Sequence, residues 1–139
     1  MRRKIVVPAL KRLDAVSVEN PAHPGTPDVN YLHGWIELKR IERWPPRKGP
    51  VRVPHFSKEQ RIWLRRRWGS GGEAYLLLLV EETHEWLLFD GQTAATLVGS
   101  TPEAQLRPRA VASWVGNARL MEELEGCLST RATLRSANA

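Results

Sequence analysis

Seven consecutive apolar residues, Ala-Tyr-Leu-Leu-Leu-Leu-Val, occupy positions 74–80 of a chain in which 26% of the residues are charged. A short apolar run that does not alternate with polar residues is typical of a strand buried on both faces. Helices must then cover both faces of its sheet, so the run predicts an α/β fold. The run is also far too short to span a bilayer.

The chain has 139 residues, the length of one domain, and its 42% hydrophobic content is sufficient for a core. We expect a single domain over residues 1–129 and a flexible tail over 130–139. The single cysteine, Cys127, excludes an intramolecular disulfide and a cysteine-cluster zinc site. Residues 1–4 begin like a secretion signal, but the apolar stretch over 5–10 is too short and contains a proline. The expectation is a soluble, cytoplasmic protein.

Turn residues and periodicity place the elements before the apolar run. Residues 15–19 alternate like a short strand. Strands over 29–32 and 35–41 are predicted to form a hairpin with His33-Gly34 as its turn. A Pro-rich, basic connection over residues 42–56 follows.

A helix is predicted over residues 58–68, with Ser57 as its N-cap and Gln60 in the capping-box position. The glycine cluster that follows Trp68 ends it. A strand over 85–89 comes after the buried run. The remainder is expected to be mostly helical, with Trp114, Leu120 and Leu124 on one apolar face. Together these elements predict a mixed sheet with an antiparallel hairpin group, flanked by helices.

Positive charge is concentrated in one part of the chain. Residues 39–67 contain eleven basic and two acidic residues, a net charge of +9, while the whole chain carries +6. Such a stripe indicates a polyanionic partner, although a solvated arginine-rich surface is the alternative. Arginine outnumbers lysine sixteen to five, and its planar guanidinium suits phosphate contacts. This composition favours nucleic acid.

The hairpin turn predicts which side chains share a face. If His33 and Gly34 form the turn, Asn30 lies opposite Glu37 and Asp28 lies opposite Lys39. These four side chains then project from one side of the hairpin, while Ile36 and Leu38 face a core.

Two converging carboxylates suit a hard cation such as Mg²⁺, which keeps several waters and accepts phosphate oxygens. A neighbouring ammonium stabilises the charge that develops during phosphodiester hydrolysis. The residues alone also allow a structural interpretation, in which Asp28 and Lys39 form an exposed cross-strand ion pair.

Three motifs occur in a characteristic order: Thr26-Pro27-Asp28-Val29-Asn30, then Gly34-Trp35-Ile36-Glu37-Leu38-Lys39, then Ser57-x-x-Gln60. Over about residues 15–90 this pattern resembles the PD-(D/E)XK nuclease superfamily, especially small phage and VRR-NUC-type nucleases and phage-type Holliday-junction resolvases. The resemblance implies a restriction-endonuclease-like core of a helix, three antiparallel strands, a helix and a further strand.

The same resemblance assigns functional roles. Asp28 and Glu37 would be metal ligands, Lys39 the catalytic lysine, and Gln60 a supporting residue near the metal or the DNA. Many relatives have an additional metal-binding glutamate on the first helix. Glu19 is the better candidate for that role here, although it stands at a predicted strand end and could pair with an arginine instead. The capping box remains the alternative role for Gln60.

The tryptophans allow two interpretations. Trp63 and Trp68 could stack on bases, but their helical spacing favours core positions with Arg65, Arg66 and Arg67 turned outward. Trp44, beside two prolines, could insert into a groove or pack on a partner subunit.

These observations predict a Mg²⁺-dependent endodeoxyribonuclease, with Mn²⁺ as a substitute metal, acting in a bacterial or phage-infected cell. Branched DNA and a homodimeric working unit are expected by resemblance to phage resolvases. The alternatives are a non-selective or nicking endonuclease and a non-catalytic DNA-binding module. The residues expected to hold nucleic acid are Arg40, Arg43, Arg47, Lys48, Arg52 and Lys58.

Overall fold

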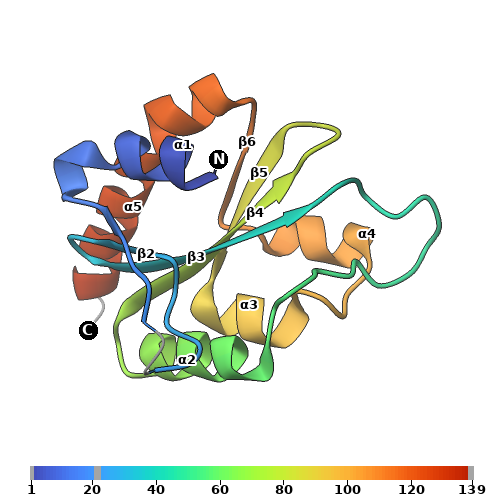
Figure 1. Ribbon diagram of the computed structural model, residues 1–139, viewed down its shortest axis with the longest axis horizontal. Coiled ribbons are helices and arrows are strands. Elements are labelled where there is room, and N and C mark those ends of the chain that lie inside the picture. The colour runs from blue at the N-terminus through green and yellow to red at the C-terminus, as the bar shows by residue number, and fades with distance from the viewer. Residues whose placement is uncertain (1, 21–22, 138–139) are drawn as a thin grey trace.

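The computed structural model describes residues 2–20 and 23–137, which form an α/β structure around a six-stranded mixed sheet (Figure 1). The strands follow one another across the sheet in chain order, and every neighbouring pair is antiparallel except β3 and β4. The predicted α/β class and mixed sheet are confirmed. The strands are β1 (Val16–Ser17), β2 (Val29–Tyr31), β3 (Gly34–Ile41), β4 (Glu73–Val80), β5 (Glu85–Asp90) and β6 (Ala112–Val115).

Helices cover both faces of this sheet. In the view of Figure 1, α1 and α5 lie above the sheet, and α2 and α3 lie below it. Among the described residues, each helix is either too short or too polar to cross a membrane. The helices are α1 (Arg2–Ala9), α2 (Lys58–Gly69), α3 (Gly91–Leu97), α4 (Glu103–Leu106) and α5 (Asn117–Ala137), with 3₁₀ turns at Lys11–Leu13 and Arg107–Arg109.

Strand β4 is the central strand that the apolar run predicts. Its side chains alternate between two cores: Tyr75 and Leu77 pack toward α1 and α5, while Leu76 and Leu78 pack toward α2 and α3. All four are fully buried. The absence of polar alternation therefore reflects two covered faces.

Helix α2 begins with the predicted capping box. The Ser57 Oγ accepts a hydrogen bond from the Gln60 main-chain N–H at 3.2 Å, and Gln60 Oε1 accepts one from the Ser57 N–H at 2.9 Å. Trp63 is buried and Trp68 is half-buried, while the arginines at positions 65–67 are exposed. The core interpretation of these tryptophans is confirmed.

The predicted register of the β2–β3 hairpin is wrong by two residues. Tyr31 pairs with Gly34 and Asn30 pairs with Trp35, so the turn is Leu32-His33. A Cβ on Gly34 would lie 1.9 Å from the main-chain oxygen of Glu73. Gly34 is therefore required inside β3, where β4 approaches closely, and not in the turn. A shift of two residues leaves every side chain on its predicted face.

The C-terminal third contains a strand that the sequence pattern does not predict. Trp114 lies in β6, where it pairs with Trp86 of β5 and is buried. It does not belong to a helical face with Leu120 and Leu124, which lie in α5. Residues 130–137 continue α5, with Ala132 buried, where a flexible tail was expected. Residues 138–139 lie outside the described residues.

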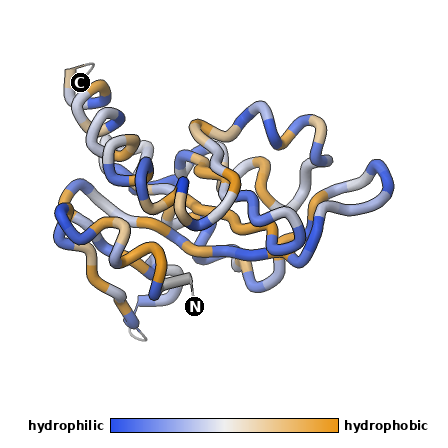
Figure 2. Tube along the Cα trace, turned by 90° about the horizontal axis from the view of Figure 1, so that it is seen from above, coloured by the Kyte–Doolittle hydropathy of each residue, from blue (hydrophilic) through white to orange (hydrophobic). Residues whose placement is uncertain are grey.

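The basic connection over residues 42–56 projects beyond the end of β3 as a hydrophilic segment, in contrast to the apolar strands (Figure 2). It forms no helix and, apart from an isolated bridge between Pro50 and Pro102, no strand pairing. The Val51 N–H donates to the Thr101 carbonyl at 3.0 Å, and Val51 is fully buried. The connection is thus fastened to the segment before α4.

Candidate functional site

Asp28 stands immediately before β2, where two neighbouring segments hold it. Its carboxylate Oδ2 accepts a hydrogen bond from the Leu38 N–H of β3 at 2.9 Å. Its carbonyl accepts one from the Val18 N–H at 2.8 Å. The side chain is half-buried, so its position is set by main-chain contacts on both sides.

Glu37 lies in β3 on the face that α2 and α3 cover, and only 1% of it is exposed. Burial raises the pKa of the Glu37 carboxyl to about 9; the hydrogen bond and negative charge of Asp28 add to this effect, and Lys39 opposes it. Among the described residues, Glu37 Oε1 has no hydrogen-bond partner. Two carboxyl groups are therefore held together in a place where the negative form of Glu37 is poorly compensated.

Lys39 lies two residues further along the same face of β3 and is 7% exposed. Its Nζ is 3.3 Å from Glu37 Oε2 and donates to the His55 carbonyl at 2.8 Å. His55 has a φ of 63°, which only a minority of non-glycine residues adopt. The end of the basic connection therefore positions the Lys39 ammonium beside the carboxylates.

A pocket of about 490 Å³ opens beside this lysine. Lys39, Arg40 and Glu42 line it from β3 and the residue after it. Pro54 and His55 also line it, so Lys39 is reachable from outside, whereas neither Asp28 nor Glu37 lines this pocket.

Gln60 lies at the first turn of α2, on the side of the sheet that carries Glu37 and Lys39. The loop before Asp28 packs against this turn at Gly25, which has a φ of 90° and whose added Cβ would lie 2.6 Å from the Glu59 carbonyl oxygen. Gln60 Oε1 is engaged by the cap. The alternative capping role of Gln60 is thus present, and the packing at Gly25 brings its turn near the loop that carries Asp28.

Glu19 is exposed, two residues beyond β1. Within residues 2–20 and 23–137, no group of three or more His, Cys, Asp or Glu side chains could hold a metal ion. The structure therefore brings together Asp28 and Glu37 but does not complete a three-ligand group with Glu19.

The six residues expected to hold nucleic acid are all exposed. Arg40 approaches Glu81 at 3.5 Å and Arg43 approaches Glu42 at 4.0 Å. Both pairs are largely solvated, so they restrain these arginines only weakly. The other four are Arg47, Lys48, Arg52 and Lys58.

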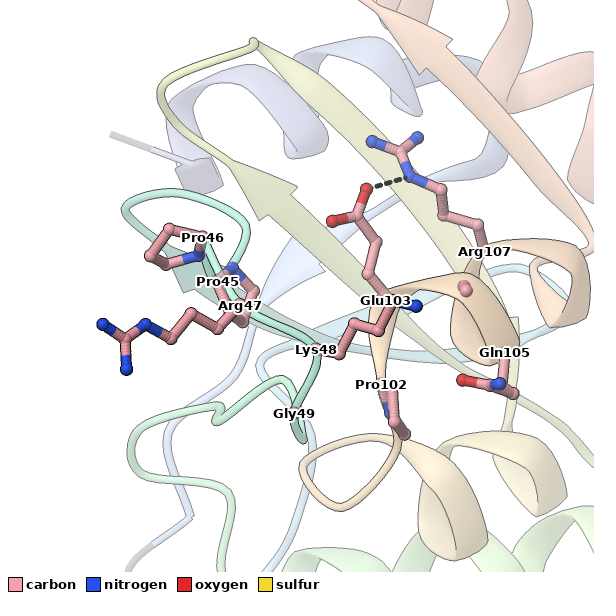
Figure 3. A pocket seen from close by; sticks show the side chains of 10 residues that line it. Pro45, Pro46, Arg47, Lys48, Gly49, Pro102, Glu103, Gln105 and Arg107 are labelled. Carbon is pink, nitrogen blue, oxygen red and sulfur yellow. Dashed lines mark hydrogen bonds and ion pairs between the residues drawn. The ribbon is translucent and has the colours of Figure 1, made fainter.

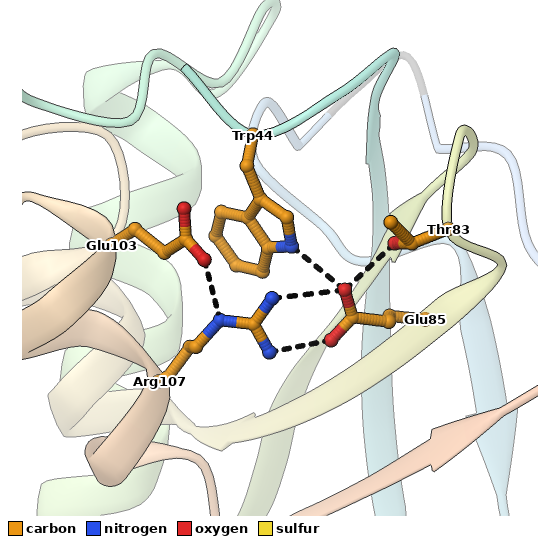
Figure 4. Close-up of polar contacts among 5 residues, drawn as sticks. All are labelled: Trp44, Thr83, Glu85, Glu103 and Arg107. Carbon is orange, nitrogen blue, oxygen red and sulfur yellow. Dashed lines mark hydrogen bonds and ion pairs between the residues drawn. The ribbon is translucent and has the colours of Figure 1, made fainter. Parts of the chain in front are cut away.

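A polar network that sequence reasoning missed fastens the start of the basic connection (Figure 4). Trp44 Nε1 donates to Glu85 Oε1 at 2.8 Å, and the Arg107 guanidinium donates to both oxygens of Glu85 at 2.5 and 2.9 Å. Arg107 Nε also donates to Glu103 at 2.7 Å. The Arg107 hydrogen bonds, with those of Trp44 and Thr83, lower the pKa of Glu85 to about 2. Trp44, Glu85 and Arg107 are far apart in the chain, and no local pattern connects these three residues.

The carboxylate pair fits a hard divalent cation. An orphaned, fully buried Glu37 oxygen beside a second carboxylate is the arrangement that a bound cation would compensate, and all the donors are oxygens. The sequence matches no protein-family model and no curated protein. Class and site are therefore described from the geometry alone. The chain is an α/β protein with a mixed sheet, in which half-buried Asp28 lies with buried Glu37 and Lys39 next to an exposed basic connection.

Proposed function

We propose that this chain is a Mg²⁺-dependent endodeoxyribonuclease with PD-(D/E)XK architecture. The observation that carries the proposal is Glu37, which is buried beside Asp28 with a pKa raised to about 9 and one oxygen without a hydrogen-bond partner in the described chain. Burying a carboxylate in this way is costly unless a cation neutralises it. Buried ionisable groups whose pKa is strongly shifted by burial and by a neighbouring charge are often found in functional sites.

The order of elements supports the proposed architecture. Strands β1, β2 and β3 form an antiparallel series, α2 follows, and β4 returns parallel to β3. This is the order that the resemblance to PD-(D/E)XK nucleases implies, with α1 as the first helix. The candidate ligand Asp28 stands just before β2, and Glu37 and Lys39 lie in β3.

Each residue then has a defined role. Asp28 and Glu37 would hold the Mg²⁺ or a substituting Mn²⁺, which supplies charge stabilisation to the scissile phosphate and lowers the pKa of bound water. Lys39, held by the His55 carbonyl, would orient the attacking water through its ammonium. Gln60 would support the loop that carries Asp28.

The proposed substrate is DNA, because a net charge of +9 is concentrated over residues 39–67, and two of its cations, Lys39 and Arg40, line the pocket described above. We also propose that the preferred substrate is branched DNA and that the working unit is a homodimer. Trp44, which the sequence allows to pack on a partner subunit, packs within its own chain, as do Trp114 and Leu124. A dimer would therefore need other surface.

The test is cleavage of a supercoiled plasmid, a linear duplex and a four-way junction with Mg²⁺, with Mn²⁺ and with EDTA. We expect metal-dependent cleavage that Asp28→Asn and Glu37→Gln each abolish without unfolding the protein. Glu122→Gln, on the exposed face of α5, is the matched control. Full activity in the Asp28 and Glu37 variants would overturn the proposal.

A non-catalytic DNA-binding module is the second candidate. It is favoured by the pair of carboxylates where the superfamily often has three ligands, and by the engagement of Lys39 with a main-chain carbonyl. This alternative predicts binding of the same DNA in EDTA and no cleavage with any metal. A nicking or non-selective endonuclease would cut plasmid and junction equally.

A further inference from the structure

A groove that the candidate active site does not use lies between the basic connection and α4 (Figure 3). One wall is formed by Pro45, Pro46 and the residues up to Gly49, and the other by Pro102, Gln105 and their neighbours. Its volume is about 510 Å³, within the range of about 300–1,000 Å³ that is typical of small-molecule sites.

Both walls of the groove are fastened. Trp44, just before the first wall, is bound to Glu85, and the same carboxylate holds Arg107 at the base of the second wall. The Arg107 guanidinium also stacks on the Trp44 ring, 4.4 Å from its centre. At the other end, Pro50 bridges to Pro102. The groove is therefore preformed, and a ligand would not have to order it.

The charge on the groove is positive. Arg47 and Lys48 are exposed, and among the described residues neither takes part in an ion pair within 4.0 Å. The one carboxylate in the lining, Glu103, is already paired with Arg107. Gln105 adds an exposed amide, which can both donate and accept hydrogen bonds.

The features of the groove match the parts of a nucleotide. The apolar proline walls could contact the face of a base, the Gln105 amide its polar edge, and the Arg47 and Lys48 cations its phosphate. We propose that this groove binds an unpaired nucleotide of the nucleic-acid substrate. The inference rests on the proposed function, since it assigns part of that substrate to a second site. Pro45 is six residues from Lys39, so the groove begins at most about 20 Å from the candidate catalytic lysine. The bound nucleotide would lie within a few positions of the scissile phosphate.

A paired base cannot present its face to the proline walls, because its neighbours stack on it. The groove would therefore favour a flap, a gap or the open centre of a junction over a continuous duplex. Binding to a uniform duplex would depend on the exposed cations alone.

The experiment is equilibrium binding in EDTA, so that cleavage plays no part. The probes are an oligothymidylate of about 12 nucleotides, comparable to single-strand site sizes, and an abasic oligomer with the same number of phosphates. Wild-type protein should bind the thymidylate at least roughly fivefold more tightly, because only this probe has bases to occupy the groove. Ala104→Phe, which fills the groove from α4, should remove that difference, whereas Ala118→Phe on exposed α5 should not.

The cations are tested with the same probes. Lys48→Ala should lower the salt dependence for both oligomers by about 0.7 in log–log slope. Lys11→Ala, which changes an exposed lysine in the 3₁₀ turn after α1, should leave it unchanged.

Three results would overturn the inference. Equal binding of both probes by wild-type protein, or an intact preference in Ala104→Phe, would show that no base enters the groove, with the nuclease proposal unaffected. Loss of self-association in Ala104→Phe, measured by sedimentation, with the base preference intact would identify the groove as a contact between copies. Failure to bind any nucleic acid would remove the proposed function along with the groove.

Discussion

Glu37 combines two requirements that ordinarily exclude each other: nearly complete burial and a second carboxyl group within hydrogen-bonding distance. In the folded chain without metal, the raised pKa means that the Glu37 carboxyl is protonated, and therefore uncharged, at neutral pH. When a divalent cation binds, that proton must leave. The affinity for Mg²⁺ is therefore expected to increase with pH up to about 9.

This linkage predicts the pH dependence of stability in EDTA. In the folded state the pKa of Glu37 is about 9, whereas in the unfolded chain it is near 4.5. Between these two pH values the folded state holds a proton that the unfolded chain has lost. The free energy of unfolding should therefore fall as the pH rises from about 4.5 to about 9, and then level off. Urea unfolding of wild-type protein and Glu37→Gln across this range isolates the contribution. Parallel curves would contradict the assignment.

Gly34 provides a second test at the residue scale. Gly34→Ala would force a Cβ to 1.9 Å from the Glu73 carbonyl oxygen at the β3–β4 pairing, so we expect a loss of about 3 kcal/mol, at the upper end of overpacking costs. Gly126→Ala is the control, because nothing lies within 4 Å of its Cβ in α5. That change should stabilise the protein by about 0.5–1 kcal/mol. Both are measured by chemical denaturation, and equal effects would refute the close approach.

At the scale of elements, the basic connection owes its shape to contacts at its two ends and its middle. Trp44 is held by Glu85, Val51 by Thr101, and His55 by the Lys39 ammonium. A segment without regular structure is ordinarily mobile, but these contacts fix its course past the candidate site. The exposed arginines and lysines between the anchors can thus be presented in a defined arrangement.

Removing the Glu85 anchor should release the start of this connection. Glu85→Gln loses the charged hydrogen bonds to Arg107, at a cost of about 1–2 kcal/mol. Trypsin should then cleave faster after Arg47 and Lys48 than in wild-type protein. Glu122→Gln on α5 is the control. Acid should act in the same way: the stabilisation from Glu85 is present above about pH 4.5 and is lost as the pH falls toward about 2. Unchanged cleavage would show that other contacts suffice.

The sequence predictions are correct where a structure depends on residues close together in the chain, and wrong where it depends on distant ones. The capping box of α2 and the buried strand β4 depend on nearby residues, and both were predicted correctly. The hairpin register depended on Glu73, which approaches Gly34 from a distant part of the chain. Strand β6 is formed by pairing with β5, which comes from a different part of the chain, and its own four residues carry no strong strand pattern.

For the candidate site, the alternation of side chains along a strand was enough to place Glu37 and Lys39 on one face, because a two-residue error in register conserves the face. The raised pKa of Glu37 could not be foreseen, since it depends on how α2 and α3 close over that face. The Trp44–Glu85–Arg107 network was likewise invisible, because its members come from three separate elements.

At the scale of the whole molecule, the two sides of the sheet differ in the functional groups that they carry. Helices α1 and α5 complete one core, while the side with α2 and α3 also carries the carboxylate pair and the basic connection. Residues 39–67 have a net charge of +9 and the whole chain has +6, so the other residues have a net charge of −3. The molecule is therefore expected to meet a polyanion with one side only.

This polarity predicts how salt affects DNA binding. Changing Arg43, Arg47, Lys48 and Arg52 together to glutamine should weaken duplex binding and reduce the log–log salt slope by about 0.9 for each phosphate that the variant no longer neutralises. The control is the equivalent fourfold change of exposed cations on the other side, at Lys4, Lys11, Arg12 and Arg119. Fluorescence anisotropy at several salt concentrations measures both. Equal slopes in the two variants would refute a one-sided contact.

The parallel pairing of β3 and β4 also has a kinetic consequence. The β2–β3 hairpin closes locally, so Asp28 and Glu37 meet early, while still in water. Pairing β3 with β4 must first close a loop over residues 42–72, which is slow because the entropy of a long segment is lost before the contacts form. Only this late event buries Glu37, so at neutral pH the chain should take up its proton from solvent in the same slow phase that completes the sheet.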